Sequence, residues 1–133
     1  MVDIIKQLKI MNKKAIKNGD VPVSCIIIKN NKIISKAYNM RNKTKNPLDH
    51  AEIIAIKRAS KKLNTYNLME CELFVTLHPC KMCLEIIKEC KIKKVYYILD
   101  NNKDINNKIY LEKINTENDY FCKELKGFFL NKR

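Results

Sequence analysis

The sequence has no apolar run that approaches the roughly 20 residues that a membrane-spanning helix needs. Nothing in it resembles an export signal, because Asp3 and Lys6 interrupt the N-terminus and no long apolar stretch follows them. It also lacks internal repeats, linkers and a low-complexity tail, and its 133 residues include only two glycines and three prolines. We therefore expect one compact domain over residues 1–133, in a soluble, cytoplasmic protein without a membrane partner.

Acidic residues are scarce beside basic ones. Lys and Arg number 27 against 14 Asp and Glu, which gives a formal net charge of +13. This charge is high for the length of the chain and favours a polyanionic partner, with nucleic acid preferred over a membrane surface. The alternative is that a compositional bias toward Asn, Lys and Ile leaves only a solvated lysine surface.

The cysteines do not form the pattern of a disulfide framework. Two of the six belong to a C-x-x-C pair, and the other four are scattered along the chain: Cys25, Cys71, Cys90 and Cys122. Scattered free cysteines are typical of small buried apolar residues, and they indicate a reducing compartment.

Hydrophobic periodicity predicts helices and strands in alternation. The expected elements are a helix from Ile4 that ends at Gly19, a hairpin of Val21–Ile28 and Lys32–Tyr38 with Asn30-Asn31 as its turn, a turn-rich segment at Asn39–Asp49, a helix that begins at His50 with Asp49 as its N-cap, a strand at Glu70–Leu77, a helix that begins at Pro79, strands at Ile92–Leu99 and Ile109–Ile114, and a helix at Tyr120–Leu130. Pro22 places the first strand at an edge of the sheet or delays its start. This alternation predicts an α/β fold, a three-layer α/β/α sandwich with a mixed five-stranded sheet.

Two short motifs supply candidate metal ligands, His50-Ala51-Glu52 and Pro79-Cys80-Lys81-Met82-Cys83. The spacing of Cys80 and Cys83 puts both sulfurs on one face of a first helical turn, where unpaired N–H groups favour thiolates. His50 begins the preceding helix, and two helix N-termini separated by a strand can meet at one end of a sheet. Three protein ligands leave a position for water on Zn²⁺, whereas a structural zinc site normally has four.

Glu52 lies too close to His50 to form an independent site, and we expect it to transfer protons as a general acid and base. The competing interpretation is a fragment of a structural zinc ribbon whose fourth ligand is His78 or Cys71. A structural zinc site requires neither a glutamate two residues after His50 nor a proline before Cys80. Beside Pro79, His78 is more simply interpreted as a residue of the pocket rim or a packed side chain.

The two motifs match the signature of the zinc nucleobase deaminases, and from Asp20 to Tyr97 the chain resembles the bacterial tRNA adenosine deaminases of the cytidine deaminase superfamily. The segments that carry this resemblance are Val21-Pro22-Val23, Asn30–Ile34, Tyr38-Asn39, His50–Ile56 and Leu73–Cys83. The resemblance implies a cytidine deaminase-like fold, a zinc ion and the proton transfer assigned to Glu52. It also implies that Asn39 hydrogen-bonds a flipped base and that Val21 lines the base pocket.

The function implied by the resemblance is hydrolytic deamination of adenosine to inosine at the wobble position of tRNA, by a homodimer that binds the anticodon arm. A deaminase of a free nucleobase or nucleoside, such as guanine or cytosine, is the alternative, because the catalytic motifs are shared. A zinc-bearing binding module without catalysis is a third interpretation.

The C-terminal segment adds to the resemblance. Cys122–Phe129 followed by Lys132-Arg133 is similar to the family's last helix, with its double Phe and basic end. Phosphate contacts are expected from three basic residues, Lys126, Lys132 and Arg133, whereas Phe128 and Phe129 are expected to pack in the core. The chain departs from the family at Ser24-Cys25, at His78 and over residues 100–114, where the family has a longer loop.

Overall fold

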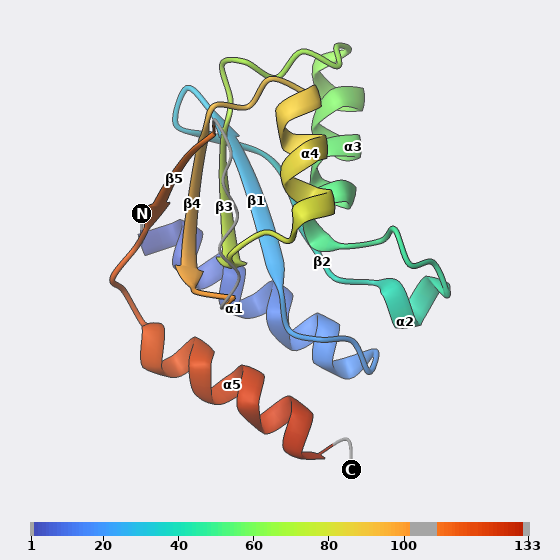
Figure 1. Cartoon of the computed structure of the whole chain (residues 1–133), viewed down its shortest axis with the longest axis vertical. Coiled ribbons are helices and arrows are strands. Elements are labelled where there is room, and N and C mark those ends of the chain that lie inside the picture. The colour runs from blue at the N-terminus through green and yellow to red at the C-terminus, as the bar shows by residue number, and fades with distance from the viewer. Residues whose placement is uncertain (1, 102–108, 132–133) are drawn as a thin grey trace.

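The structure is a computed structural model that describes residues 2–101 and 109–131 (Figure 1). Its elements in chain order are α1 (Val2–Lys17), β1 (Ser24–Lys29), β2 (Lys32–Tyr38), α2 (Arg41–Thr44), α3 (Ala51–Leu63), β3 (Glu72–Leu77), α4 (Lys81–Glu89), β4 (Lys94–Leu99), β5 (Tyr110–Lys113) and α5 (Asn118–Asn131). Within the described ranges, no helix is both long enough and apolar enough to cross a membrane.

The strands form one mixed sheet in the order β2-β1-β3-β4-β5. β1 is antiparallel to both β2 and β3, whereas β3, β4 and β5 are parallel to one another. Because parallel neighbours need a crossover connection, the chain passes through α4 between β3 and β4. The carboxyl ends of these two strands therefore lie together, at the end of the sheet where α4 begins.

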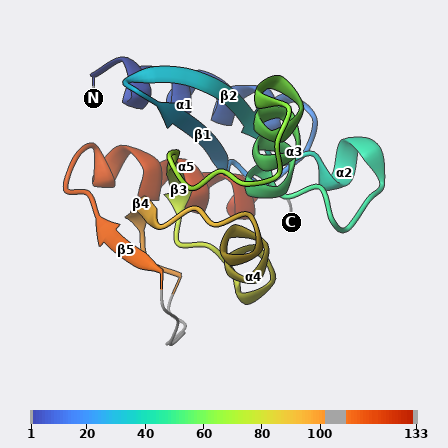
Figure 2. The same cartoon turned by 90° about the horizontal axis from the view of Figure 1, so that it is seen from above.

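Helices cover both faces of the sheet, as the three-layer prediction requires. α3 packs on β1 and β2 and contacts α4, whereas α1 packs on β1, β2 and β3, and α5 packs on β4. Viewed from above, α3 and α4 lie on one side of the sheet and α1 and α5 on the other (Figure 2). The α/β/α sandwich predicted from the alternation of elements is confirmed.

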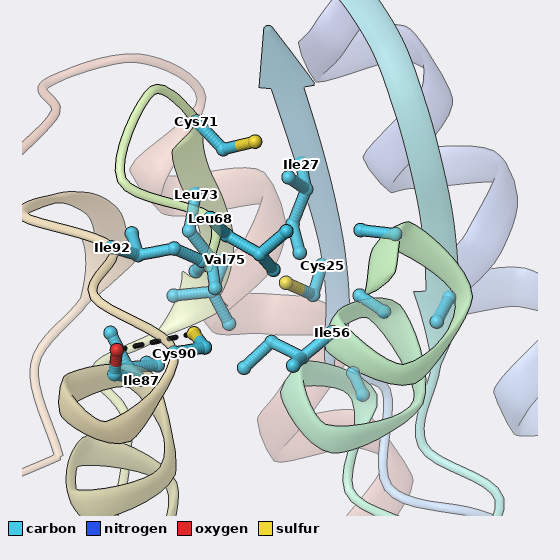
Figure 3. Packing of buried hydrophobic residues seen from close by; sticks show 14 of the residues in the cluster. Cys25, Ile27, Ile56, Leu68, Cys71, Leu73, Val75, Ile87, Cys90 and Ile92 are labelled. Atoms are coloured by element: carbon cyan, nitrogen blue, oxygen red, sulfur yellow. Dashed lines mark hydrogen bonds between the residues drawn. The ribbon is translucent and has the colours of Figure 1, made fainter. Parts of the chain in front are cut away.

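A buried cluster between the sheet and the α3–α4 layer forms the larger part of the core (Figure 3). Ile27, Leu73 and Val75 contribute from the two central strands, and each side chain is at most 1% exposed. Cys25, Cys71 and Cys90 are buried in the same cluster as free thiols, as predicted for small apolar residues. Burial raises the pKa of the Cys25 thiol well above its ordinary value, so this thiol stays protonated.

The hairpin prediction is confirmed in detail. Asn30 and Asn31 have positive φ values of 51° and 61°, the conformation that a type I′ turn demands. Pro22 delays the start of β1 to Ser24, and β1 lies inside the sheet and not at its edge. The sheet accommodates Pro22 because this residue precedes β1, where no backbone N–H group is needed for a hydrogen bond to a neighbouring strand.

Two predictions around residues 39–50 are wrong. Asp49 is not the N-cap of α3, since His50 occupies that position without a capping hydrogen bond from its side chain. The Asp49 carboxylate instead accepts a hydrogen bond of 2.7 Å from the Thr44 hydroxyl, and Asp49 lies one residue before the N-cap position. The segment expected to be only turns also contains the short helix α2.

The last helix matches its expected position, but only one of the two phenylalanines near its end, Phe128 and Phe129, packs as predicted. Phe128 is 9% exposed, whereas Phe129 is 54% exposed. Adjacent positions on a helix point in directions about 100° apart, and in α5 Phe128 lies on the buried face with Phe121 whereas Phe129 lies outside it.

Candidate functional site

The candidate ligands lie at the N-termini of the two helices in the α3–α4 layer. His50 is the N-cap residue of α3 and Cys80 is the N-cap residue of α4, both with extended backbone angles. Residues at this position usually cap their helix with a side-chain oxygen, yet neither side chain makes a capping hydrogen bond. Both side chains are instead directed toward a shared point, and Cys83 reaches it from the first turn of α4.

The three side chains are close enough to hold one metal ion. His50 Nδ1 lies 3.8 Å from Cys80 Sγ and 3.5 Å from Cys83 Sγ. All three ligand atoms lie within 4.8 Å of one another, and in the described part of the chain neither Cys71 nor His78 joins this group. The predicted ligand set is therefore brought together, and the described residues do not supply the fourth ligand that a zinc ribbon requires.

Hydrogen bonding favours a negative charge on the Cys80 sulfur. A hydrogen bond from Cys83 and another from His50 lower the pKa of the Cys80 thiol to about 3. The contact with Cys80 also raises the pKa of His50. A thiolate at Cys80 beside the His50 imidazole is thus already favoured here. The hydrogen bond with Cys80, together with burial, raises the pKa of the Cys83 thiol, so a metal ion bound here would displace the proton of Cys83.

Glu52 lies beside the ligands on the first turn of α3 and is only 4% exposed. Burial raises the pKa of its carboxyl group to about 7, against the opposing effects of a backbone hydrogen bond and of His50. The carboxyl group is near the metal ligands without belonging to the ligand group. A buried carboxyl group that titrates near neutrality is suited to proton transfer.

A cavity of about 180 Å³ opens in front of these residues. Two of the candidate ligands, His50 and Cys80, line it together with Glu52, and so do the two residues predicted to contact a base, Val21 and Asn39. The structure therefore brings together residues from the segment before β1, the end of β2, the start of α3 and the start of α4.

Asn39 is 8% exposed, and its backbone surroundings fix its side chain. Its Oδ1 accepts a hydrogen bond of 3.1 Å from the Arg41 N–H, and its Nδ2 lies 3.5 Å from the Val21 carbonyl oxygen. A carbonyl oxygen can accept two hydrogen bonds. One acceptor position of Asn39 therefore remains for a molecule in the cavity.

The sequence did not indicate three other cavity-lining residues: Arg41, Leu77 and Asn101. Asn101 follows β4, and its Nδ2 donates a hydrogen bond of 3.1 Å to the His78 carbonyl oxygen. His78 also lines the cavity, with its ring centroid 4.7 Å from that of Tyr97, in agreement with the pocket-rim interpretation. Asn101 belongs to a polar segment without periodicity, so no sequence signal marks it.

The predicted phosphate-contacting residues lie outside the cavity. Lys126 is exposed on α5 and is not one of the cavity-lining residues. Lys132 and Arg133 lie outside the described residues.

The family model of the MafB19-like deaminases matches residues 2–133 of this chain. The tRNA-specific adenosine deaminase of Aquifex aeolicus (strain VF5) is 48% identical over 85 residues, which are 64% of this chain and 56% of that relative. The tRNA-specific adenosine deaminase of Rickettsia bellii (strain RML369-C) is 38% identical over 105 residues, 77% of this chain and 70% of the relative. The match thus spans little more than half the length of the Aquifex relative.

Solved structures share the fold. A structure from a study of A-to-I editing by tRNA:A34 deaminases at the wobble position of transfer RNA matches with a TM-score of 0.76 and 20% identity, over 85% of this chain and 98% of that chain. Guanine deaminase from Bacillus subtilis matches with a TM-score of 0.66 and 24% identity, over 94% of this chain and 90% of that chain. The same fold occurs in a structure from a study of tRNA:A34 deaminases and in a guanine deaminase. These similarities therefore establish the fold of this chain and not its substrate.

Proposed function

Because the chain belongs to the MafB19-like deaminase family, we propose that it is a zinc-dependent hydrolase that deaminates adenosine to inosine at the wobble position of tRNA. The observation that carries this proposal is the position of the Glu52 carboxyl group beside the group of His50, Cys80 and Cys83, in the wall of one cavity. The names of the two relatives support the RNA substrate. The net charge of +13 is consistent with a polyanionic partner.

The donor set fits zinc. One imidazole nitrogen and two sulfurs within 4.8 Å of one another are ligands that Zn²⁺ prefers, and a set of three is typical of catalytic sites. When bound by His50, Cys80 and Cys83, zinc supplies a water molecule whose lowered pKa makes it a nucleophile near neutral pH.

Glu52 would carry the protons of the reaction. Its carboxylate accepts the proton that the attacking water loses and delivers it to the ring nitrogen beside the carbon under attack. A second proton, passed by the same group, allows the amino group to leave as ammonia. The C–N bond breaks, a C=O bond forms in its place, and one water molecule is consumed for each ammonia released.

The cavity walls would orient the base. The free acceptor position of the Asn39 amide can receive a hydrogen bond from the edge of a base, while Val21 provides an apolar contact for its face. With Asn39 and Val21 in these roles, the base is held with its reacting carbon toward Glu52.

The proposed partner is the anticodon arm of tRNA, and the proposed active form is a cytoplasmic homodimer. In Figure 1, α5 crosses below the end of the sheet at which α3 and α4 begin. Lys126 on this helix is exposed and is proposed to contact phosphate, together with Lys132 and Arg133.

Deamination of a free base is the second candidate, favoured by the similarity in fold to guanine deaminase. One experiment separates the two functions. Zinc-loaded protein is incubated with transcribed tRNA that carries adenosine at position 34, and separately with guanine, cytosine and adenosine. We expect A-to-G changes at position 34 on sequencing. Absence of conversion together with ammonia release from a free base would overturn the RNA assignment.

A further inference from the structure

A basic segment borders the cavity on the side of α2. The α2 segment, defined here as residues 40–48, contains Arg41, Lys43 and Lys45 and has no acidic residue. All three basic side chains are exposed. Arg41 also lines the cavity, together with Asn39 and His50. The positive charge of its guanidinium group therefore lies at the edge of the candidate site.

The backbone of the α2 segment is held in place from outside the segment. Asp20, which is 3% exposed, accepts hydrogen bonds from the backbone N–H groups of Asn42, at 2.5 Å, and Lys43, at 3.1 Å. The Asn42 side chain donates a further hydrogen bond of 2.8 Å to the Asn18 carbonyl oxygen. The segment is therefore anchored through its backbone and through Asn42, and this anchoring does not engage the side chains of Arg41 and Lys43.

Two nearby carboxylates, Asp20 and Asp49, are hydrogen-bonded to neutral donors of the α2 segment and not to its cationic side chains. Asp20 accepts the two backbone N–H groups, and Asp49 accepts the Thr44 hydroxyl. In the ranges that the structure describes, the ion pairs join Lys9 to Glu117, Lys29 to Glu70 and Lys113 to Asp100. None of these pairs involves the α2 segment. Lys45 Nζ donates a hydrogen bond of 3.0 Å to the neutral Asn42 side chain, so Arg41 and Lys43 are the cations best placed to meet an external anion.

We propose that the α2 segment binds the phosphodiester backbone of RNA beside the target nucleotide, with the Arg41 guanidinium group on the phosphate nearest the cavity. This inference rests on the proposed function, because it takes the substrate to be RNA. A nucleotide whose base enters a pocket leaves its flanking phosphates at the rim. The planar fork of an arginine side chain matches a phosphate group, and a free base has no phosphate to bind.

The test compares charge-removing variants on a common RNA, an anticodon-arm hairpin with adenosine at position 34. We expect Arg41→Gln to raise KM for the hairpin on the order of tenfold, as for loss of a hydrogen bond to a charged group. Its plot of log affinity against log salt should be less steep by about one unit. Arg41→Lys should restore the salt slope, because it keeps the charge, and only part of the KM, because it loses the fork.

Lys62→Gln is the matched control, since it removes the same charge near the far end of α3, about 18 Å along the helix from His50. It should leave KM and the salt slope unchanged, and all variants should keep the wild-type zinc content and circular dichroism spectrum. Wild-type conversion of the hairpin together with equal KM and slope for Arg41→Gln and Lys62→Gln would overturn the α2 proposal alone. A wild-type protein that neither binds nor converts the hairpin would overturn both proposals.

Discussion

At the scale of single residues, the proposed chemistry depends on a carboxyl group that is close to the candidate metal ligands and yet separate from them. Burial raises the pKa of Glu52 to about 7, whereas the contact with Cys83 and the imidazole of His50 lower it. Together these opposing effects keep the pKa of Glu52 near neutrality. A carboxyl group with such a pKa can both accept and release a proton at neutral pH.

Glu52→Gln should retain the metal and lose turnover. The amide fills the same space but cannot accept the proton of water, so kcat should fall by about 10²–10⁴-fold. Ammonia release measures turnover, and elemental analysis measures zinc per chain. Glu85→Gln, at an exposed position on α4, is the control and should behave as wild type. Full activity of the Glu52 variant would remove this residue from the mechanism.

At the scale of elements, the turn between α1 and β1 supports the cavity wall. Gly19 has a φ of +75°, and a Cβ atom added there would lie 3.0 Å from Asn42 Nδ2. The turn that places Asp20 against α2 therefore depends on a residue that has no side chain. Sequence reasoning identified Gly19 as a helix end, but not as part of the support for α2.

The two glycines of the chain should respond in opposite ways to replacement by alanine. Gly19→Ala should lower the free energy of unfolding by about 1–2 kcal/mol, because an L-residue is strained at positive φ. Gly127 lies within α5, where an added Cβ meets nothing within 4 Å. Gly127→Ala should raise the free energy of unfolding by about 0.5–1 kcal/mol through helix propensity. Urea unfolding measures both values, and equal effects would contradict this account.

At the scale of the whole molecule, the candidate metal site joins two helices that are separate in sequence. His50 comes from α3 and the two cysteines from α4, and both helices lie on the same face of the sheet. A metal ion bound there would link the helices only in the folded chain. The free energy of metal binding would then add to the free energy of unfolding.

Chelation should therefore lower the melting temperature of the wild-type protein. Free zinc at one hundred times its Kd stabilises the folded state by about 2.7 kcal/mol, which corresponds to a shift of several degrees in Tm. The Tm of Cys83→Ser should be insensitive to a chelator, whereas that of Cys122→Ser, whose half-buried thiol lies on α5 away from the ligand group, should respond as wild type. Scanning calorimetry with and without chelator tests this, and an unchanged wild-type Tm would argue against the metal.

The sequence alone was sufficient for features that depend on short spacings. Asn30-Asn31 between β-branched runs predicts the hairpin, and the spacing of Cys80 and Cys83 predicts two sulfurs on one helical face. The alternation of elements predicts the mixed sheet. The hairpin and the cysteine pair depend on residues a few positions apart, whose geometry is fixed by the period of a helix or a strand, and the sheet follows from the order of the elements so recognised.

Only the tertiary structure decided which segments meet at the end of the sheet. Arg41 and Asn101 line one cavity because the segments after β2 and β4 converge there, and no local pattern marks either residue. Asn101 illustrates this limit, because its side chain donates a hydrogen bond to the carbonyl oxygen of His78, a residue 23 positions away in the chain. Propensities act between neighbours in the chain, whereas a cavity wall and its charges depend on packing between distant segments.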